Sequence, residues 1–439
     1  MSVQSNASYF FVPFQLQEPL DFPETVRRLD RSDCWTPVGE RILYFMKYVS
    51  DKLDTGDPEH CQCFRFCLNP EARGRFGLSE PDSVYHIEPL RHVAEQETYP
   101  FYLGDVELFC FRTSVCILAI QVSFLKNDPI HISSGQFYLK KVAKEKVYPQ
   151  SGTGSFTLLE LARRLMDTLG EKVPPVPFFF ANPGSERANV FSRLEVPPQE
   201  DYDRELFYLR RCYSGGYLYQ PDPELDAREI YRPAQDTVWG MSAEAAVCLV
   251  CPERGKEQFL RGAFYRNFKS QYLLMYVLLL HQKYVLYLFL TEVGTGIRDD
   301  LALLESYRER LYDFMTDFVF SRISEVPQYQ NLYDRLQHVF ALEELFDDVR
   351  EPLAALRNLQ LEQDAKKQQR QDARINRMLF VLSLLTGFSV LSDGHAAIES
   401  YASPYLPPLL VEGLQYGFAA LVIGALAWGI ITLIRSDRK

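Results

Sequence analysis

Positive charge is in short supply in this chain of 439 residues. It contains 47 Lys and Arg against 58 Asp and Glu, which gives a net charge of -11 at pH 7. A protein that binds DNA or RNA through its phosphates needs a basic surface to displace counterions. We therefore expect no DNA or RNA partner. The net charge does not exclude a small nucleotide ligand, because a local pocket needs only a few basic groups.

The sequence also lacks the motifs of the common enzyme classes. It has no phosphate-binding loop, no nucleophile elbow and no HExxH motif. The glycine-containing fragments at residues 152–154 and 294–296 are too short to indicate a site. We therefore expect no enzymatic activity and no tightly bound cofactor.

A disulfide framework is not indicated either. The nine cysteines are odd in number and irregular in spacing. The N-terminus has no basic region followed by an apolar core, so we expect no signal peptide and a cytoplasmic body with reduced thiols. Candidate zinc ligands are His60, Cys61, Cys63, Cys67, Cys248 and Cys251. Their spacing matches no strong zinc motif, so we interpret the cysteines as buried structural thiols.

Two long apolar segments lie near the C-terminus. Residues 416–434 carry no charge and would span about 28 Å as a helix, close to the hydrocarbon thickness of a bilayer. Residues 378–391 are too short alone, but they become long enough when extended to Ile398, past Asp393 and His395. We predict two transmembrane helices, with a re-entrant or buried helix as the alternative for the first. Small residues on the second helix, where another helix could approach closely, are Gly413, Gly417, Ala420 and Gly424.

The basic residues around these segments predict an orientation. Arg370, Arg374 and Arg377 precede the first segment, and a basic tail follows the second. The connection over residues 392–415 has no Lys or Arg. The positive-inside rule therefore places both termini in the cytoplasm and the short acidic loop outside, in a cell membrane with two spans.

The rest of the chain reads as an α+β body followed by long helices. No Gly or Pro interrupts the chain between Leu353 and Thr386, so we expect one helix from about Pro352 through the polar stalk into the membrane. Residues 272–290 are apolar, but His281, Gln282 and Lys283 fall in the middle, so we expect a buried helix of the body. We expect further helices over about 298–324 and after Pro327.

The first half of the chain mixes strands and helices. Strands are predicted over residues 63–67, 106–111, 115–124 and 137–142, and an amphipathic helix over 156–169 with Thr157 near its N-cap. Residues 171–235 are rich in Pro and Gly and carry scattered charges, so we interpret them as a long excursion on the surface. We expect three parts: a mixed α/β cytoplasmic domain over 1–255, a long-helix bundle and stalk over 256–377, and a transmembrane hairpin with a basic tail over 378–439.

This order of parts resembles the CorA family of divalent metal ion transporters. The resemblance is most specific over about residues 340–439, where residues 375–378 look like the family's entry from stalk to membrane. It implies a homopentamer that surrounds a pore lined by the first span. It also implies Mg²⁺ as substrate or regulator. The family's Gly-Met-Asn motif is absent, however, and the corresponding region reads SDGHAAIESYASPYL.

One face of the first span carries the candidate pore residues. A helical wheel places six residues within about 100° of one another. They are Asn376, Leu379, Ser383, Thr386, Val390 and Asp393. Two spans cannot enclose a path, so several copies would have to surround an axis and place these groups in rings. Asp393 and Glu399 would attract cations to the outer mouth. The alternative is that Ser383 and Thr386 only bond their own helix carbonyls.

An acidic run precedes the stalk. Glu343, Asp347 and Glu351 recur every four residues, on one face of a helix. Carboxylates suit Mg²⁺ or Ca²⁺, so a regulatory metal site between subunits is one interpretation. A solvated helix face is the other, and the more ordinary one.

Three functions remain after these exclusions. The first is a CorA-like homo-oligomeric channel that passes metal cations down their gradient. The second is a nucleotide-gated effector channel of the same architecture, like divergent relatives encoded beside CRISPR systems. The third is a membrane-anchored binding protein that conducts nothing. The polar face of the first span favours the first two.

Overall fold

A computed structural model gives the fold, and it describes residues 5–436 with several gaps. The gaps are residues 17–20, 40–41, 54–56, 79–82, 90–96, 151–153, 170–174, 294–300 and 403. The chain divides into two compact units, residues 1–352 and 353–439. The first contains a large mixed sheet with helices, and the second contains two long helices, so the fold class is α+β.

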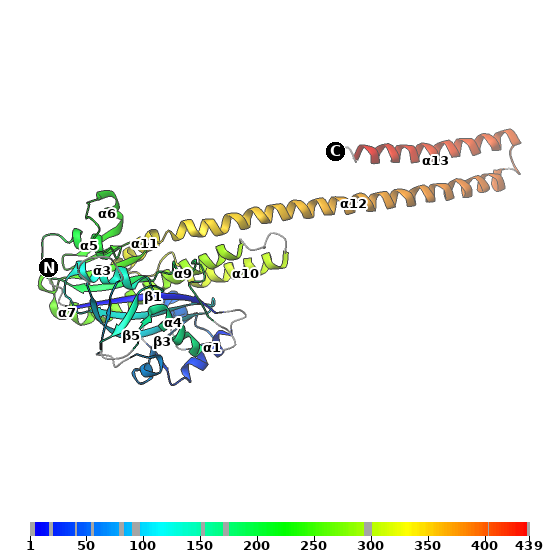
Figure 1. Ribbon diagram of the computed structural model, residues 1–439. Helices are drawn as coiled ribbons and strands as arrows, with labels where there is room; N and C mark the ends of the chain where they lie inside the picture. The colour runs from blue at the N-terminus through cyan, green and yellow to red at the C-terminus, as the bar shows by residue number, and fades with distance from the viewer. Residues whose placement is uncertain are drawn as a thin grey trace. The chain divides into compact units, whose positions relative to one another are not determined.

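The described residues of the first unit form one 13-stranded sheet (Figure 1). Its order is β11-β12-β13-β10-β1-β6-β5-β4-β7-β8, with β2 on β3, β3 on β5 and β9 on β1. All pairs are antiparallel except β10 with β13. The strands are β1 Ser5–Gln15, β2 Trp35–Pro37, β3 Cys63–Leu68, β4 Val84–Ile87, β5 Tyr99–Phe111, β6 Val115–Phe124, β7 Lys146–Pro149, β8 Phe156–Thr157, β9 Val176–Pro177, β10 Asn189–Glu195, β11 Ile230–Ala234, β12 Thr237–Met241 and β13 Ala245–Val250.

The strands predicted over residues 106–111 and 115–124 are confirmed as parts of β5 and β6. Strands β5 and β6 pair antiparallel, and Ser114 closes the turn between them with a left-handed φ of 67°. The strand predicted over residues 63–67 is also confirmed, as β3. Runs of aromatic, β-branched and other apolar residues of this kind favour buried strands, so the sequence predicted them.

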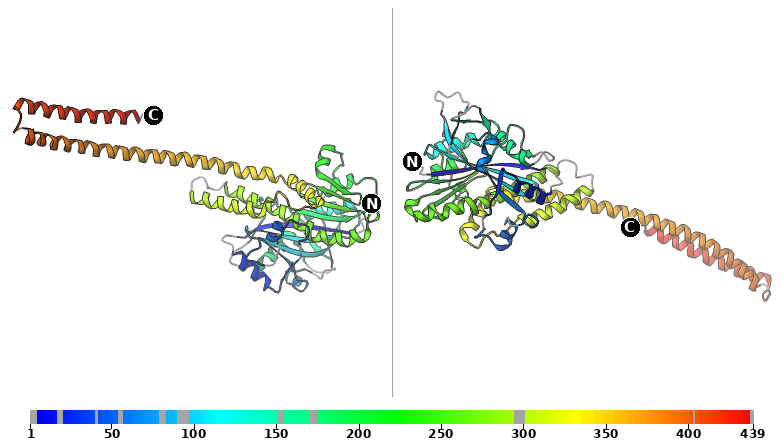
Figure 2. Two further views of the ribbon diagram at one scale, coloured as in Figure 1. Left: turned by 180° about the vertical axis from the view of Figure 1, so that it is seen from behind. Right: turned by 90° about the horizontal axis from the view of Figure 1, so that it is seen from below.

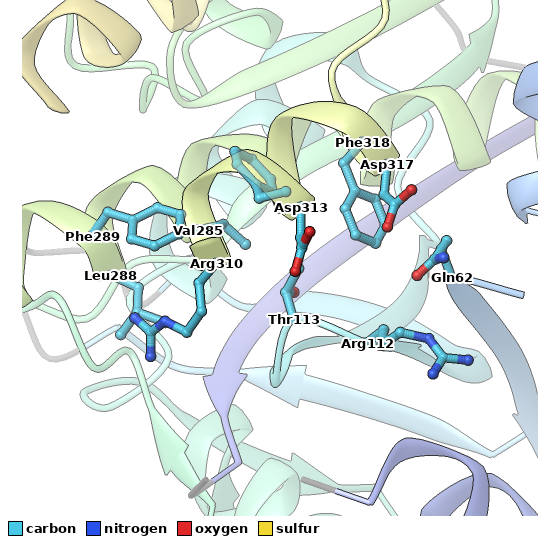
Figure 3. A pocket seen from close by; sticks show the side chains of 11 residues that line it. Gln62, Arg112, Thr113, Val285, Leu288, Phe289, Arg310, Asp313, Asp317 and Phe318 are labelled. Carbon is cyan, nitrogen blue, oxygen red and sulfur yellow. The ribbon is translucent and has the colours of Figure 1, made fainter. Parts of the chain in front are cut away.

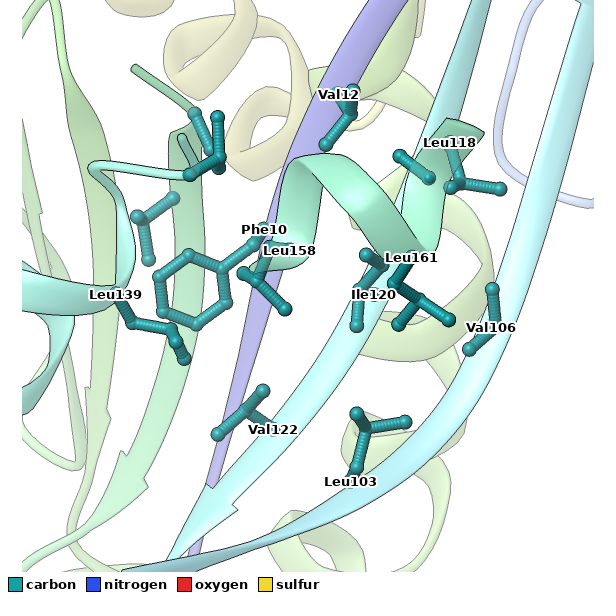
Figure 4. Close-up of a cluster of buried hydrophobic side chains, with 14 of the residues drawn as sticks. Phe10, Val12, Leu103, Val106, Leu118, Ile120, Val122, Leu139, Leu158 and Leu161 are labelled. Atoms are coloured by element: carbon teal, nitrogen blue, oxygen red, sulfur yellow. The ribbon is translucent and has the colours of Figure 1, made fainter. Parts of the chain in front are cut away.

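Alternate residues of β1 face two separate layers of the body, as a strand's period of two requires. Phe10 and Val12 belong to the main core, where Leu118 and Ile120 of β6 meet Leu158 of α4 (Figure 4). Helices associated with the sheet before residue 230 are α1 Phe22–Asp30, α2 Lys47–Leu53, α3 Pro129–Leu139, α4 Leu158–Met166, α5 Asp203–Leu209 and α6 Pro223–Glu229, with short 3₁₀ turns η1 Pro70–Phe76 and η2 Asp167–Leu169. The amphipathic helix predicted near residue 156 is α4. Thr157 is its N-cap, as predicted, and it also forms a capping box with Glu160.

The strand predicted over residues 137–142 is wrong. Residues 137–139 end α3, which begins after the N-cap Asp128, whose carboxylate accepts a hydrogen bond from the His131 backbone N–H. Gly135 allows close packing, since a Cβ there would lie 2.4 Å from the Phe124 ring. A short apolar run cannot distinguish a buried helix from a strand by period alone.

The surface excursion predicted over residues 171–235 is wrong in part. Its β10 is a fully buried strand between β1 and β13, deep in the sheet. The misleading signal was charge: Arg193 and Glu195 are both buried and form an ion pair with each other. Arg261 adds a second cation to Glu195. A paired charge can be buried where a single charge cannot.

The other layer of the body is helical. The 3₁₀ turn η3 Pro252–Arg254 leads to α7 Glu257–Arg261, α8 Ala263–Asn267, the π-helix η4 Phe268–Tyr272 and α9 Leu273–Val293. Tyr276 of α9 lies against Phe11 of β1 and Phe191 of β10, at ring-centroid distances of 5.4 and 4.7 Å. The helix predicted to be buried near residues 272–290 is therefore confirmed. The apolar window that contains it is 89% buried within the protein.

Four more helices follow α9 in the described part of the chain. They are α10 Leu301–Phe318, α11 Pro327–Val339, α12 Leu342–Ala402 and α13 Pro408–Ser436. The predicted continuous helix is confirmed as α12, which has 61 residues and begins ten residues before Pro352. Within the second unit, α13 lies beside the C-terminal part of α12 and runs antiparallel to it (Figure 2).

Candidate pore-lining site

Two helices of the second unit are long and apolar enough to cross a membrane. They cover residues Met378–Ala402 of α12 and Pro408–Gly429 of α13. None of the α12 window and 6% of the α13 window is buried within the protein. An apolar helix that its own chain does not cover needs another apolar environment, which indicates membrane association.

Glycines of α12 let the two helices approach each other. A Cβ at Gly387 would lie 2.9 Å from the Leu426 side chain, and one at Gly394 would lie 2.1 Å from the Phe418 ring. These two positions are seven residues apart and so lie on one face of α12. The contact face therefore runs along Gly387 and Gly394. Sequence reasoning missed them, although their spacing was a readable signal.

The small residues noted in α13 do not make this contact. A Cβ at Gly413, Gly417 or Gly424 would meet nothing within 4 Å. At about 100° per residue these glycines lie on the side of α13 opposite Phe418 and Leu426. In the single chain, a Cβ at the glycines of this face would contact no other part of the protein.

The predicted polar face of α12 lies beside the glycine face and is not covered by α13. Ser383, Thr386, Val390 and Asp393 are all exposed in the single chain. The side chain of Asn376 lies outside the described residues. Every described member of the predicted face is therefore accessible to another copy, to lipid or to water.

The hydroxyl groups on this face bond their own helix. Ser383 Oγ donates to the Leu379 carbonyl at 2.9 Å, and Thr386 Oγ1 donates to the Leu382 carbonyl at 2.8 Å. This is the local bonding expected of Ser and Thr in lipid. It does not use up the hydroxyl oxygens, whose lone pairs can still face a passing cation.

Two carboxylates stand near the C-terminal end of α12. Asp393 accepts a long hydrogen bond of 3.5 Å from Ser389 Oγ, and Glu399 is exposed near the last residue of the helix, Ala402. The unsatisfied carbonyls at a helix C-terminus carry partial negative charge. The two carboxylates and the helix end therefore give this region negative charge.

The acidic run at the start of α12 forms no metal site in the single chain. Glu343, Asp347 and Glu351 are exposed. Among the residues that the structure describes, no three His, Cys, Asp or Glu side chains gather closely enough to hold a metal ion. A site shared between subunits stays a prediction.

The cysteines behave as buried thiols. None is in a disulfide, and all but Cys67 are buried. Burial raises the pKa of the Cys63 thiol well above its usual value, which keeps it protonated. Cys63 is on β3 and Cys248 is on β13, and β5, β6, β1 and β10 lie between these strands. Five strand spacings of about 4.8 Å separate them by roughly 24 Å, too far for a shared zinc ion.

No family model, curated protein or solved structure matches the chain. The class of the protein therefore rests on its own structure. It is an α+β protein with a large sheet and C-terminal helices, two of which are long and apolar enough to cross a membrane.

Proposed function

We propose that copies of this chain assemble around an axis and pass metal cations through a pore lined by α12. The observation that carries the proposal is the polar face of Ser383, Thr386 and Asp393, which α13 leaves uncovered in a hairpin that is apolar enough to cross a membrane. A charged side chain facing lipid near the bilayer centre costs several kcal/mol, and Asp, Glu and Lys within spans usually face a protein interior or water. An axial pore supplies that environment.

Assembly follows from the geometry of one hairpin. Two helices cannot enclose a water-filled path, so the pore needs several copies related by rotational symmetry. Each copy would add Ser383, Thr386 and Asp393 to rings of oxygen atoms that replace part of an ion's hydration. Flow is passive, because no ATP-binding motif is present.

The resemblance to the CorA family supports a homopentamer and a divalent substrate such as Mg²⁺. Within this proposal the basic residues before and after the spans keep both termini in the cytoplasm, and Asp393 and Glu399 face outside. Because the Gly-Met-Asn motif is missing, the oxygen rings of α12 would have to select the ion.

The proposal is tested by ion flux from proteoliposomes that contain the full chain. Mg²⁺, Ni²⁺ and Co²⁺ should enter, and Asp393→Asn should lower the rate about tenfold by removing the carboxylate ring. Asp348→Asn is the matched control, because Asp348 is exposed on α12 before the membrane segment. No cation flux from the wild type, or equal flux in Asp393→Asn and Asp348→Asn, would contradict the proposal.

A gated channel of the same architecture is the second candidate. The observation that favours it is a cavity in the body whose wall touches the first turns of α12, through Phe314 and Phe346. The nucleotide ligand expected from the resemblance is less well supported at this cavity, because its volume of about 220 Å³ is small for a dinucleotide and its two arginines are balanced by Asp313 and Asp317. A non-conducting anchor remains the outcome if no condition opens a pathway.

A further inference from the structure

A cavity of about 220 Å³ lies between the β5–β6 turn and the α9–α10 helices (Figure 3). The turn contributes Arg112 and Thr113, and Gln62 precedes β3. The helices contribute Val285, Leu288, Phe289, Arg310, Asp313, Phe314, Asp317 and Phe318. At about 30 Å³ per water the space corresponds to roughly seven waters, which suits a small molecule better than a dinucleotide.

The helical wall of the cavity is aromatic. Phe289, Phe314 and Phe318 line it, and the rings of Phe289 and Phe314 lie 5.9 Å apart. Phe314 and Phe318 are 2% exposed, so the wall is fixed by packing. The faces of such rings carry negative potential and attract cations.

Most charged groups at the cavity already have partners. Asp317 accepts from Lys52 Nζ at 2.8 Å, and Arg310 forms an ion pair with Glu292. Arg112 donates to the carbonyls of Pro58, Glu59 and Cys61. In Figure 3 its guanidinium group points away from Asp313.

Asp313 differs from these groups. It is exposed to solvent, and within the described part of the chain it forms no hydrogen bond and no ion pair. It lies one helical turn before Asp317. In Figure 3 its carboxylate points toward Thr113, across the cavity mouth. An unpaired carboxylate beside aromatic rings is the combination that binds an ammonium group attached to an apolar body.

From this geometry we propose that the cavity binds a small organic amine, with its ammonium group on Asp313 and its apolar part against Phe289, Phe314 and Phe318. The lining holds two carboxylates and two guanidinium groups, of which Asp317 is paired with Lys52 and Arg310 with Glu292. The Arg112 guanidinium points away from Asp313 in Figure 3, so an anion beside the aromatic wall would face the unpaired Asp313. A neutral apolar molecule would leave Asp313 unpaired. An amine pairs its ammonium group with the Asp313 carboxylate and packs its apolar part against the aromatic wall.

The site is joined to the helix that enters the membrane. Phe314 stacks on Phe346 of α12 at a ring-centroid distance of 6.1 Å, with 23° between the ring planes. α12 continues from Phe346 to Ala402 without a break. A ligand bound against Phe314 therefore lies one ring away from the helix that carries the polar face. This coupling rests on the proposed function, whereas the binding site does not.

Isothermal titration of the full chain in detergent with phenethylamine tests the binding site. We expect saturable binding to the wild type, and about tenfold weaker binding to Asp313→Asn. Glu309→Gln should bind like the wild type, because Glu309 is an exposed α10 carboxylate outside the cavity. The uncharged analogue 2-phenylethanol should bind about tenfold more weakly than phenethylamine. No saturable binding at about 1 mM, or equal binding by Asp313→Asn, overturns the site.

Flux measurements separate the site from the coupling. Phenethylamine should change cation flux through the wild type and leave Phe346→Ala unaffected. Binding with an unchanged wild-type flux overturns the coupling alone. Binding in a protein that passes no ion under any condition contradicts the proposed function and leaves the site standing.

Discussion

Three polar residues in the middle of α9 decide where that apolar helix belongs. His281 Nε2 lies 2.7 Å from Thr113 Oγ1 in the β5–β6 turn. Gln282 Nε2 donates to the Phe318 carbonyl at 2.6 Å. Lys283 Nζ donates to the Ala243 carbonyl at 3.3 Å, and burial lowers its pKa to about 8. Each residue ties α9 to a different part of the body, which accounts for polar groups where a membrane span would not tolerate them.

His281 gives a prediction about pH. Its ring is fully buried against Phe111 at a centroid distance of 3.8 Å, and burial lowers its pKa well below the usual value. A histidine with a lowered folded-state pKa contributes its full stability above about pH 6.5, where the unfolded state is also neutral. As pH falls below that value only the unfolded state gains the proton, so stability drops by up to about 1.4 kcal/mol per pH unit until the folded-state pKa is reached.

Thermal unfolding of the full chain in detergent measures this effect. We expect the melting temperature of His281→Phe to fall less than that of the wild type between about pH 7.5 and about pH 5. His338→Phe is the matched control, because His338 is exposed on α11 and its loss should leave the wild-type pH dependence in place. A pH dependence in His281→Phe equal to that of the wild type would show that His281 does not titrate on unfolding.

At the scale of elements, the sequence predicted the strands and helices that have a long apolar run or a recognisable cap. The hairpin β5–β6, the capped helix α4, buried α9 and continuous α12 each carry a run or a cap that tertiary contacts reinforce. The sequence failed at α3, where a short apolar run fits either period. It also failed at β10, where Arg193 and Glu195 neutralise each other in the core.

The sequence also predicted part of the candidate site, because a long helix has a regular period. Helical period placed Ser383, Thr386, Val390 and Asp393 on one face of one helix. It could not show which face meets α13, because that depends on two helices at once. The cavity beside Asp313 was also out of reach, since Thr113, Phe289 and Phe314 are distant in the chain and only packing brings them together.

The glycine contact between α12 and α13 gives a prediction at this scale. Gly394→Ala places a methyl group against the Phe418 ring, so the hairpin must open or Phe418 must move, at a cost of about 1–3 kcal/mol. Gly413→Ala is the control, because a Cβ there meets nothing within 4 Å in the single chain. Thermal stability in detergent should fall for Gly394→Ala and recover in Gly394→Ala with Phe418→Ala. Equal stability of Gly394→Ala and Gly413→Ala would show that the helices do not pack through Gly394.

At the scale of the whole molecule, a single chain leaves two faces of its C-terminal helices without a protein partner. α12 presents a polar face, and α13 presents an open face of small residues on the side away from α12. Symmetric assembly in a bilayer would give the polar face water and the small residues a neighbouring helix. The function proposed for the chain therefore belongs to the assembly, in which a single hairpin would supply one sector of the pore.

The central claim is that this face of α12 lines the path of the ions, and a membrane-impermeant thiol reagent tests it most directly. Val390 lies on the polar face and Val381 on a face turned away from it, and both are exposed in the single chain. Val→Cys at each position makes a matched pair in a chain whose own cysteines are nearly all buried. The account predicts that reagent added outside blocks cation flux through Val390→Cys and leaves Val381→Cys and the wild type unaffected. Equal effects at the two positions, or block of Val390→Cys only from the cytoplasmic side, would contradict it.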